Sequence, residues 1–374
     1  MNNLNKLYID KKALQHNYNQ IRKHIGDGVK IMPMVKANAY GCGMKEVVKI
    51  LAADYYAVGN ISEAKALKKI VPNSRIMIIY QPLIQDINTI VKNDFLCAVC
   101  DLSFVKALDK AAKKADKKAY IHLEIDTGMS RLGLHTDEYV SFSHTLKSLN
   151  NVVIEGIFTH YSVADSLTSD SLAYTEEQTK QFIKATQIIE AIIGPIKYHH
   201  ACSGAAIFNP VTKIFNMVRP GYILYGYYAD EEYRKLVNLK PALKLTTKII
   251  KISEYEAGTD VGYNRYFRTN RKTKIATVGI GYANGLFRSL YSPKNKVNGH
   301  MVVNGQRAPI AGTICMDTTM LDVADIKGKI KIGDEVAIFD NENVTLDELT
   351  KIIDTIGYEF IARISDSVTK IIID

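Results

Sequence analysis

The stretch that most constrains the fold is KIMPMVKANAYGCG, Lys30–Gly43. The five residues after Lys30 are apolar, which predicts a buried strand, and the run ends at Lys36. Two alanines, a tyrosine and two glycines follow, which indicates a glycine-rich bend. A lysine that closes a buried strand costs free energy unless its amine is paired or neutral. The stretch therefore predicts a special role for Lys36.

Strands and helical stretches alternate from this region to about residue 220. Short runs rich in valine, isoleucine and aromatic residues are separated by stretches with helical spacing, which is typical of parallel βαβ units. Eight such runs predict a closed TIM-type (β/α)8 barrel rather than an open sheet. The predicted strands are residues 30–36, 55–59, 75–80, 95–100, 119–126, 152–158, 196–201 and 214–220.

The pattern changes after about residue 240. Short alternating runs, several of them separated by NG or KG turns, predict a mostly antiparallel β domain. A helix should begin at Thr345, which has Glu348 in the capping-box position. We therefore predict an α/β fold with a barrel domain over residues 1–236 and a β domain over residues 237–374. Residues 1–10 are expected to pack with the β domain.

Composition excludes several classes of protein. The 374 residues are 47% hydrophobic and 23% charged, which is ordinary for a globular chain. No window has the about 18 consecutive apolar residues of a membrane span, and no signal peptide is evident, so we expect a cytoplasmic protein without a membrane partner. The net charge of +9 is partly due to a lysine-rich helical stretch without interleaved aromatic residues, so no nucleic-acid partner is expected. The five scattered cysteines indicate neither disulfides nor a metal site.

Unusual polar residues follow the predicted barrel strands. Function in such barrels lies on the loops after the carboxyl ends of the strands, so these residues are expected at one rim. They are Lys36 after the first strand, Glu124 and Arg131 at and after the fifth, His160 after the sixth, Ser203 after the seventh, and Arg219 and Gly221 after the eighth. Each taken alone has a structural explanation, but their convergence indicates an active site.

A lysine at this rim suggests a cofactor. A lysine with a lowered pKa forms a Schiff base with an aldehyde, and glycine-containing loops let backbone N–H groups approach a phosphate. The combination points to pyridoxal 5′-phosphate (PLP). Aldolase-type barrels also use lysines, so the residue types alone leave both possibilities open.

Nine motifs, in a fixed order, resemble the alanine racemase family of fold-type III PLP enzymes. They are MVKANAYGCG, IDTGMSRLG, FTHYS, HHACSGAA, VRPGYILYG, VGYNRYF, IGYANG, APIAGTICMD and GYEFIARIS, and the resemblance spans nearly the whole chain. It implies a (β/α)8 barrel followed by a β domain, a small amino-acid substrate, and a head-to-tail homodimer whose subunits share each active site.

The resemblance also implies residue roles. Lys36 would hold PLP as a Schiff base and act as one base, and Tyr263 of the partner subunit would be the second base, on the opposite face of the substrate. His160 would hydrogen-bond that tyrosine. Arg219 would face the pyridine nitrogen and keep it unprotonated, which disfavours transamination. The phosphate-binding positions are Tyr40, Ser203, Gly221 and Tyr358. The substrate-binding positions are Arg131 and, from the partner subunit, Tyr282 and the backbone N–H of Met316.

Some positions depart from the family pattern. Glu124 stands where many members have a lysine that becomes carbamylated, and we hypothesise that its carboxylate orients Arg131 instead. Cys42 and Cys202 replace a histidine and an asparagine, and Thr313 replaces an arginine.

The leading interpretation is an alanine racemase that supplies D-alanine for peptidoglycan. The alternatives are a serine or broader-specificity racemase, a non-catalytic PLP carrier and a PLP decarboxylase. A carrier would lack the β domain and Tyr263, and Cys315 fits the racemase motif better than a decarboxylase site.

Overall fold

The computed structural model describes residues 4–374, and the chain divides into two compact units. The barrel unit consists of Gln15–Ala37 and Val47–Lys240. The β unit consists of the N-terminal residues up to Leu14, Asn38–Glu46 and Pro241–Asp374. Each unit is described by itself below.

The barrel unit contains eight parallel strands, six in one sheet and two in a pair, and isolated bridges join the sheet and the pair into a ring. Six strands pair in the order β3-β4-β5-β6-β7-β8, and β2 pairs with β9. A bridge from Met34 to Ala57 joins β2 to β3, and a bridge from Ser203 to Arg219 joins the chain after β8 to the chain after β9. The predicted barrel is confirmed. The strands are β2 (Lys30–Ile31), β3 (Tyr55–Val58), β4 (Arg75–Ile78), β5 (Leu96–Val99), β6 (Ala119–Glu124), β7 (Val152–Phe158), β8 (Tyr198–His200) and β9 (Met217–Val218).

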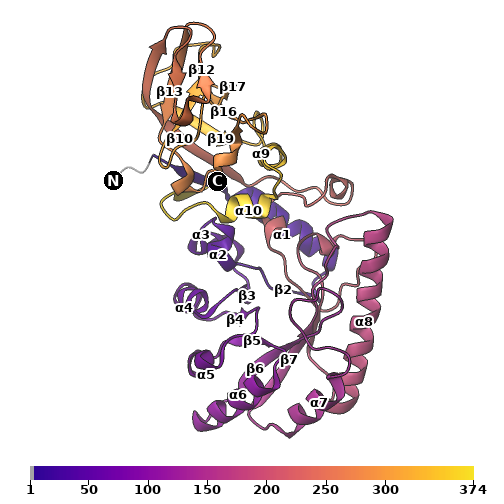
Figure 1. Ribbon diagram of the computed structural model, residues 1–374. Coiled ribbons are helices and arrows are strands. Elements are labelled where there is room, and N and C mark those ends of the chain that lie inside the picture. The colour runs from indigo at the N-terminus through magenta and orange to yellow at the C-terminus, as the bar shows by residue number, and fades with distance from the viewer. Residues whose placement is uncertain (1–3) are drawn as a thin grey trace. The chain divides into compact units, whose positions relative to one another are not determined.

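Helices stand outside the ring of strands (Figure 1). Every residue of β3 and β5 is buried, as expected for parallel strands covered on both faces. Most of the lysine-rich stretch lies in α6, which ends at Lys114, and the next strand, β6, begins at Ala119. The helices up to residue 240 are α1 (Lys11–Ile25), α2 (Lys36–Tyr40), α3 (Met44–Leu51), α4 (Ile61–Ile70), α5 (Ile87–Asn93), α6 (Leu102–Lys114), α7 (Tyr139–Ser148) and α8 (Ser169–Ile193), with 3-10 turns η1 (Ile84–Asp86), η2 (Gly204–Ile207), η3 (Tyr222–Tyr225) and η4 (Glu231–Lys235).

The bend after Lys36 is a left-handed turn of non-glycine residues. Residues 37–40 all have positive φ, from 51° at Ala37 to 58° at Tyr40, and Gly41 and Gly43 continue at 76° and 92°. A left-handed helical residue costs about 1–2 kcal/mol when it is not glycine. Gly41 also needs to be glycine for space, because a Cβ atom there would lie 2.1 Å from the carbonyl oxygen of Ile361. The sequence predicted a bend made by glycines, but the turn begins before them.

The β unit is built on a mainly antiparallel sheet, as predicted. Its strand order is β17-β16-β19-β10-β1-β20, and β13 pairs with both β10 and β18. The pairing of β20 with β1 is parallel. The strands are β1 (Lys6–Asp10), β10 (Leu243–Tyr255), β11 (Asp260–Val261), β12 (Phe267–Arg268), β13 (Thr273–Val278), β14 (Tyr291–Ser292), β15 (Val297–Asn298), β16 (His300–Val303), β17 (Gln306–Pro309), β18 (Thr319–Asp322), β19 (Glu335–Phe339) and β20 (Thr369–Ile373).

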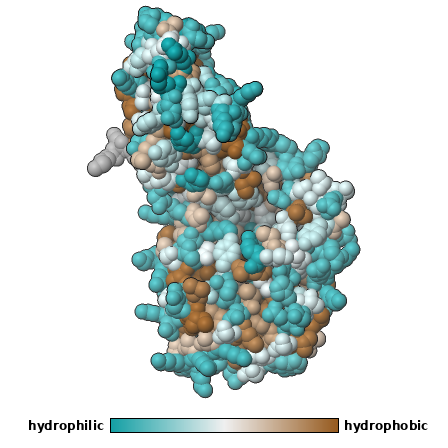
Figure 2. All heavy atoms as spheres, viewed as in Figure 1, coloured by the Kyte–Doolittle hydropathy of each residue, from teal (hydrophilic) through white to brown (hydrophobic). Residues whose placement is uncertain are grey.

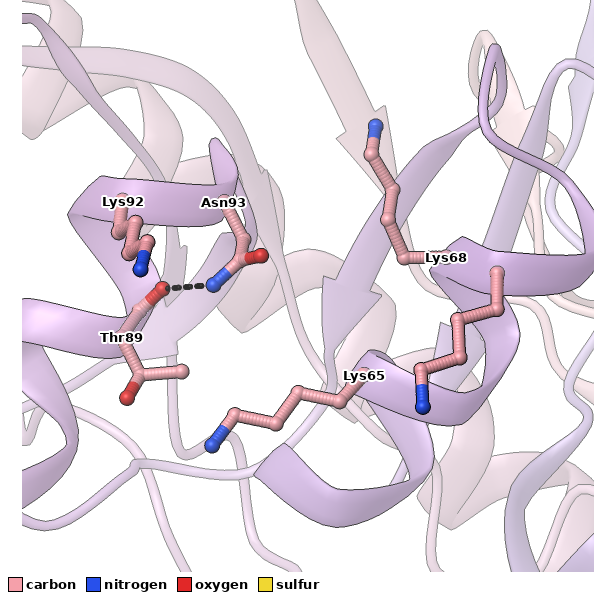
Figure 3. A pocket seen from close by; sticks show the side chains of 6 residues that line it. Lys65, Lys68, Thr89, Lys92 and Asn93 are labelled. Carbon is pink, nitrogen blue, oxygen red and sulfur yellow. Dashed lines mark hydrogen bonds between the residues drawn. The ribbon is translucent and has the colours of Figure 1, made fainter.

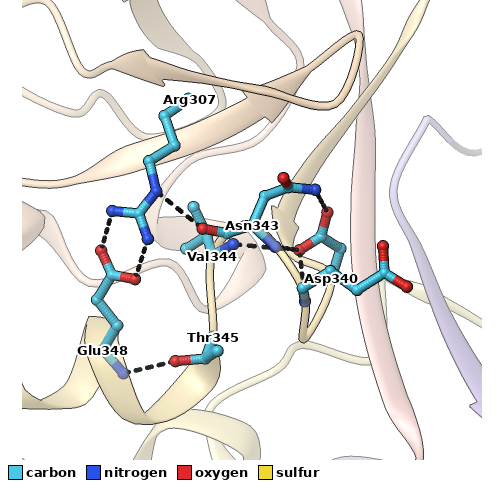
Figure 4. Close-up of polar contacts among 7 residues, drawn as sticks. Arg307, Asp340, Asn343, Val344, Thr345 and Glu348 are labelled. Atoms are coloured by element: carbon cyan, nitrogen blue, oxygen red, sulfur yellow. Dashed lines mark hydrogen bonds and ion pairs between the residues drawn. The ribbon is translucent and has the colours of Figure 1, made fainter.

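The short helices of the β unit follow local capping rules. They are α9 (Leu346–Ile352) and α10 (Gly357–Ala362), with 3-10 turns η5 (Tyr263–Arg265), η6 (Tyr282–Asn284) and η7 (Arg288–Leu290). The Thr345 hydroxyl accepts from the Glu348 N–H at 3.1 Å, so the predicted N-cap is confirmed (Figure 4). The Glu348 carboxylate forms a two-point ion pair with Arg307, at 2.7 and 2.6 Å. That pair ties α9 to β17.

The face of the molecule seen in Figure 2 is mainly hydrophilic or neutral, with scattered hydrophobic residues. Scattered apolar side chains are normal on protein surfaces. Within residues 4–374, no helix is both long enough and apolar enough to cross a membrane.

Candidate active site

The rim residues of the barrel unit lie at the carboxyl ends of its strands, as the sequence predicted. Lys36 follows β2, Glu124 ends β6, His160 follows β7, Ser203 follows β8 and Arg219 follows β9. All strands in the ring are parallel, so these ends share one rim.

Arg219 is the most buried charge at the rim, with 2% of its side chain exposed. Its Nη1 donates to the ring Nδ1 of His200 at 2.6 Å and to the carbonyl oxygen of His200 at 3.0 Å. Its Nη2 donates to the carbonyl oxygens of Thr159 at 2.9 Å and Ala201 at 3.2 Å. Burial lowers the pKa of Arg219 to about 10, so it stays charged at neutral pH. Among the described residues the Nε–H has no acceptor, which leaves one donor for a ligand.

Two buried histidines continue the hydrogen bonds of Arg219. Because the guanidinium can only donate, Nδ1 of His200 accepts and its Nε2 carries the proton. Nε2 of His200 then donates to Nδ1 of His122 at 2.7 Å. Burial lowers the pKa of His122 to about 3 and that of His200 well below its ordinary value, so both rings are neutral. Neither histidine has a role predicted from the sequence, because His122 lies inside one predicted strand and His200, although it belongs to the HHACSGAA motif, lies inside another.

Gly156 in β7 makes room for the His122 ring. A Cβ atom at Gly156 would lie 2.5 Å from Nδ1 and 2.6 Å from Cε1 of His122. The contact fixes one edge of the ring, so Gly156 supports the alignment of the two histidines under Arg219.

Glu124 is 4% exposed, and its Oε2 has no hydrogen-bond partner among the described residues. Burial raises the pKa of Glu124 to about 7, although the charges of Arg219 and Arg131 act in the opposite direction. No ion pair joins Glu124 to Arg131 in the part of the chain that the structure describes. The orienting role that we hypothesised for Glu124 therefore stays a prediction. The charge of Arg131 acts to lower the pKa of Glu124, without a hydrogen bond or ion pair between the two groups among the described residues.

Lys36 has a partner that the sequence did not single out. Its Nζ donates to the hydroxyl of Tyr80 at 2.5 Å, and Arg131 lies over the same ring with its Cζ 5.6 Å from the centroid. The next residue is fixed by Glu63, whose Oε1 accepts from the N–H of Ala37 at 2.7 Å. Tyr80 and Glu63 come from the ends of separate strand–helix segments, so spacing in the sequence could not reveal them.

His160 connects several of the rim residues. Its Nδ1 lies 3.4 Å from the hydroxyl oxygen of Ser203. Burial lowers the pKa of His160 to about 3, with further contributions from Arg219, Arg131 and Lys36. The three cations are thus close enough to affect one ring, and His160 is neutral at pH 7. Its Nε2 has no hydrogen-bond partner among the described residues.

The predicted phosphate-binding residues fall into two groups. Ser203 and Gly221 immediately precede the 3-10 turns η2 and η3 in the barrel unit. The first N–H groups of such turns are not used within the turn. Tyr40 and Tyr358 belong to the β unit, where their rings lie edge to face with centroids 6.2 Å apart.

The three predicted partner-chain residues are brought together in the β unit. The Tyr282 N–H donates to the carbonyl oxygen of Cys315 at 3.1 Å. Cys315 directly precedes Met316, so Tyr282 and Met316 lie on backbone segments that are hydrogen-bonded to each other. The Thr313 hydroxyl lies 3.3 Å from the carbonyl oxygen of Tyr263. The side chains are exposed, 65% for Tyr263, 40% for Tyr282 and 54% for Met316.

The cysteines take no part in a disulfide. Burial raises the pKa of Cys202 to about 11, so its thiol is neutral, and its Sγ lies 3.4 Å from the carbonyl oxygen of Lys213. Cys42 is also buried. Across residues 4–374, no group of three or more His, Cys, Asp or Glu side chains is arranged to hold a metal ion.

A hollow of about 400 Å³ lies between α4 and α5, away from the residues described above (Figure 3). It is lined by Lys65, Lys68, Lys69, Thr89, Lys92 and Asn93. The Asn93 amide donates to the Thr89 carbonyl at 2.8 Å, which is an ordinary contact within a helix. The lysine side chains extend in different directions in Figure 3, as on solvated helix faces, so we assign no function to this hollow.

Comparison with known proteins identifies the family. Residues 9–229 match the family model described as "Alanine racemase, N-terminal domain", and residues 242–372 match "Alanine racemase, C-terminal domain". The chain belongs to the alanine racemase family. The prediction made from the motifs is thus confirmed, and so are the enzyme class, an isomerase of amino acids, and the cofactor of the family, PLP.

Named relatives support the family assignment over nearly the whole chain. Alanine racemase 2 of Caldanaerobacter subterraneus subsp. tengcongensis is 37% identical over 98% of this chain and 94% of its own length. Alanine racemase of Methanococcus maripaludis is 35% identical over 97% of both chains. The solved structure of alanine racemase from Clostridium difficile 630 has a TM-score of 0.91 and 32% identity, over 98% of this chain and 95% of that one. Another structure of that protein is a complex with cycloserine.

The donor groups at the barrel rim fit PLP. The cofactor presents an aldehyde, a pyridine nitrogen and a phosphate. The rim has an amine at Lys36, the spare Nε–H of Arg219, and Ser203 with two 3-10 turns. Each group of the cofactor therefore has a donor of matching chemistry.

The raised pKa of Glu124 predicts a pH-dependent stability. The Glu124 carboxyl binds its proton more tightly in the folded state than in the unfolded chain. Its contribution to the free energy of unfolding is therefore fully present below about pH 4.5 and is lost as pH rises through about 7. The free energy of unfolding of the cofactor-free protein should therefore fall, relative to Glu124→Gln, by about 3 kcal/mol across that range. Urea denaturation at several pH values measures the difference. Parallel curves for the two proteins would contradict the assignment, and Glu176→Gln, on the surface of α8, controls for loss of a charge.

The packing of Gly156 against His122 predicts a second effect. Gly156→Ala should lower the free energy of unfolding by about 1–3 kcal/mol, because the added methyl group overlaps the His122 ring. The control is Gly28→Ala, where a Cβ atom meets nothing within 4 Å. If the two variants are equally stable to urea, the His122 ring is not held by Gly156.

Proposed function

We propose that the protein interconverts L-alanine and D-alanine by a two-base mechanism, with PLP bound at the barrel rim. The observation that carries the proposal is the convergence at one rim of Lys36 with its amine hydrogen-bonded to a neutral hydroxyl, and Arg219 with one spare donor. The named relatives are alanine racemases, which favours alanine as the substrate. D-alanine made in this way would supply peptidoglycan.

Lys36 and Arg219 would bind the two reactive ends of the cofactor. When bound, PLP supplies an electron-withdrawing ring that makes the α-proton of an amino acid acidic. Lys36 would hold the cofactor through Nζ. Once the substrate amine has displaced it, the free Lys36 amine would take or return a proton at Nζ on one face of the substrate. The Nε–H of Arg219 would donate to the ring nitrogen. Because a guanidinium does not release its proton, Arg219 would supply no proton to that nitrogen, and the electron withdrawal available from the ring would be limited.

Tyr263 would serve as the second base, from the partner subunit. Inversion at the α-carbon needs proton transfer on both faces, and one lysine serves one face. The exposure of Tyr263, Tyr282 and Met316 on one region of the β unit supports a role toward another chain. His160, neutral and with Nε2 available, would accept a hydrogen bond from the Tyr263 hydroxyl or donate one to it. The proposal thus includes a homodimer with shared active sites.

The remaining rim residues would bind anionic groups. Arg131 forms no hydrogen bond or ion pair with another described residue, so its guanidinium can bind the substrate carboxylate. Ser203 and Gly221 would bind the phosphate, together with Tyr40 and Tyr358. Glu124 is buried and would limit the movement of the Arg131 guanidinium through electrostatic attraction at a distance, rather than through a salt bridge.

The test of the reaction uses the purified protein with PLP. We expect an absorbance band at about 420 nm that is lost in Lys36→Ala, since only Lys36 forms the Schiff base. Pure L-alanine should lose its circular dichroism, and L-serine should compete weakly. A protein that binds PLP and leaves L-alanine unchanged would contradict the proposed function, and faster loss of signal from L-serine would favour the serine racemase.

The two-base assignment has its own test. Tyr263→Phe should retain exchange of the α-proton with deuterium from solvent for one enantiomer but lose racemisation by a factor of about 100 or more, because one face has lost its base. The matched control is Tyr266→Phe, another exposed tyrosine of the same loop. Equal racemisation rates in the two variants would exclude Tyr263 as a base.

A further inference from the structure

We propose that Tyr80 is a positioning residue of the active site, whose hydroxyl holds the Lys36 amine in place while the cofactor is attached. The inference rests on the proposed function, since it needs Lys36 to be the lysine that binds PLP. Tyr80 lies two residues after the end of β4, at the same rim as Lys36. It stands in none of the motifs that carry the family resemblance.

The contact between the two side chains is a hydrogen bond. The Nζ–hydroxyl distance is 2.5 Å, and the distance from Nζ to the ring centroid is 5.0 Å. Because the hydroxyl lies at the edge of the ring, an amine bonded to it is necessarily far from the centroid. A face-on cation–π contact would place the amine closer to the centroid than to the hydroxyl, so that contact is secondary here.

A hydroxyl partner suits a lysine that must lose its proton. A carboxylate would stabilise the ammonium form and oppose the attack of the neutral amine on an aldehyde. A tyrosine hydroxyl accepts from the ammonium and can turn to donate to the neutral amine. The hydrogen bond therefore survives deprotonation, and Nζ stays at one place before and after it.

The surroundings fix both partners. A Cβ atom at Gly59 would lie 3.6 Å from the Cβ of Lys36 and 3.7 Å from Cε2 of Tyr80, so the end of β3 lies beside both side chains. Glu63 accepts from the N–H of Gly59 at 2.8 Å as well as from that of Ala37, which ties the end of β3 to the residue after Lys36. The alignment of the amine with the hydroxyl is thus set by three strand ends.

Other tyrosines of the barrel unit show what a packing role looks like. The Tyr56 hydroxyl donates to the Val48 carbonyl at 3.1 Å, and the Tyr55 hydroxyl donates to Glu155 at 3.0 Å. Both rings are buried. Tyr80 is half-buried, bonds to an amine, and has the guanidinium of Arg131 over its ring. It therefore lies between the two cations that the proposed function places beside the cofactor and the substrate.

The experiment measures attachment of the cofactor rather than turnover. PLP is added to the cofactor-free protein, and the rate of appearance of the band at about 420 nm is recorded for the wild type and for Tyr80→Phe. Loss of one hydrogen bond should slow attachment about 3- to 10-fold. The affinity for pyridoxine 5′-phosphate, which has an alcohol in place of the aldehyde and cannot react with Lys36, should be unchanged. Tyr80→Leu, which also removes the ring, should be at least as slow.

The matched control is Tyr120→Phe. The Tyr120 ring also lies under an arginine, with the Cζ of Arg75 4.5 Å from its centroid, but it is at the start of β6 and away from the rim. Attachment in this variant should proceed at the wild-type rate. Equal attachment rates in Tyr80→Phe and the wild type would overturn the inference while leaving the proposed function intact. An equal loss of affinity for pyridoxine 5′-phosphate and for PLP in Tyr80→Phe would do the same. If the wild type gives no band, the proposed function fails as well.

Discussion

A buried guanidinium needs acceptors for most of its donors, and this requirement organises the part of the barrel rim formed by the ends of β7, β8 and β9. Four N–H groups of Arg219 are satisfied by His200, Thr159 and Ala201, which lie at or just after the carboxyl ends of β7 and β8. The carboxyl ends of β7, β8 and β9 therefore lie at the same level of the barrel. The fifth donor, the Nε–H, has no acceptor among the described residues and is therefore the one available to a ligand.

The same constraint extends inward through neutral side chains. A histidine that accepts from a guanidinium must place its proton on the other nitrogen, which determines the donor to the next ring. His200 and His122 form such a directed pair, and the missing side chain of Gly156 gives the second ring its space. Because burial keeps both rings neutral, they align Arg219 without adding charge.

The electrostatics of the rim suit an anionic ligand. Three cations, Lys36, Arg131 and Arg219, act on the His160 ring, and the buried carboxyl of Glu124 has a pKa near neutrality because of burial. A site of this kind attracts a phosphate and a carboxylate. Strain is concentrated at the same place, in the left-handed turn after Lys36. Glu63 accepts from the N–H of Ala37 and the Asn38 side chain accepts from the N–H of Met44, and these bonds hold a conformation that the residues would not adopt alone.

The sequence by itself determined the order of strands and helices, the β domain, the N-cap at Thr345 and the family, because hydrophobic periodicity, turn residues and motifs are local. Eight strands predicted a barrel, but its closure is a property of the tertiary structure. The sequence also placed Lys36, His160, Ser203 and Arg219 at one rim, since parallel strands bring their ends together. Only the tertiary structure decided which side chains meet there. Tyr80, Glu63 and His122 are separated from their partners by whole βα units, so their pairing depends on barrel closure. The left-handed turn likewise follows from long-range hydrogen bonds, which override the intrinsic preference of alanine and asparagine for right-handed backbone.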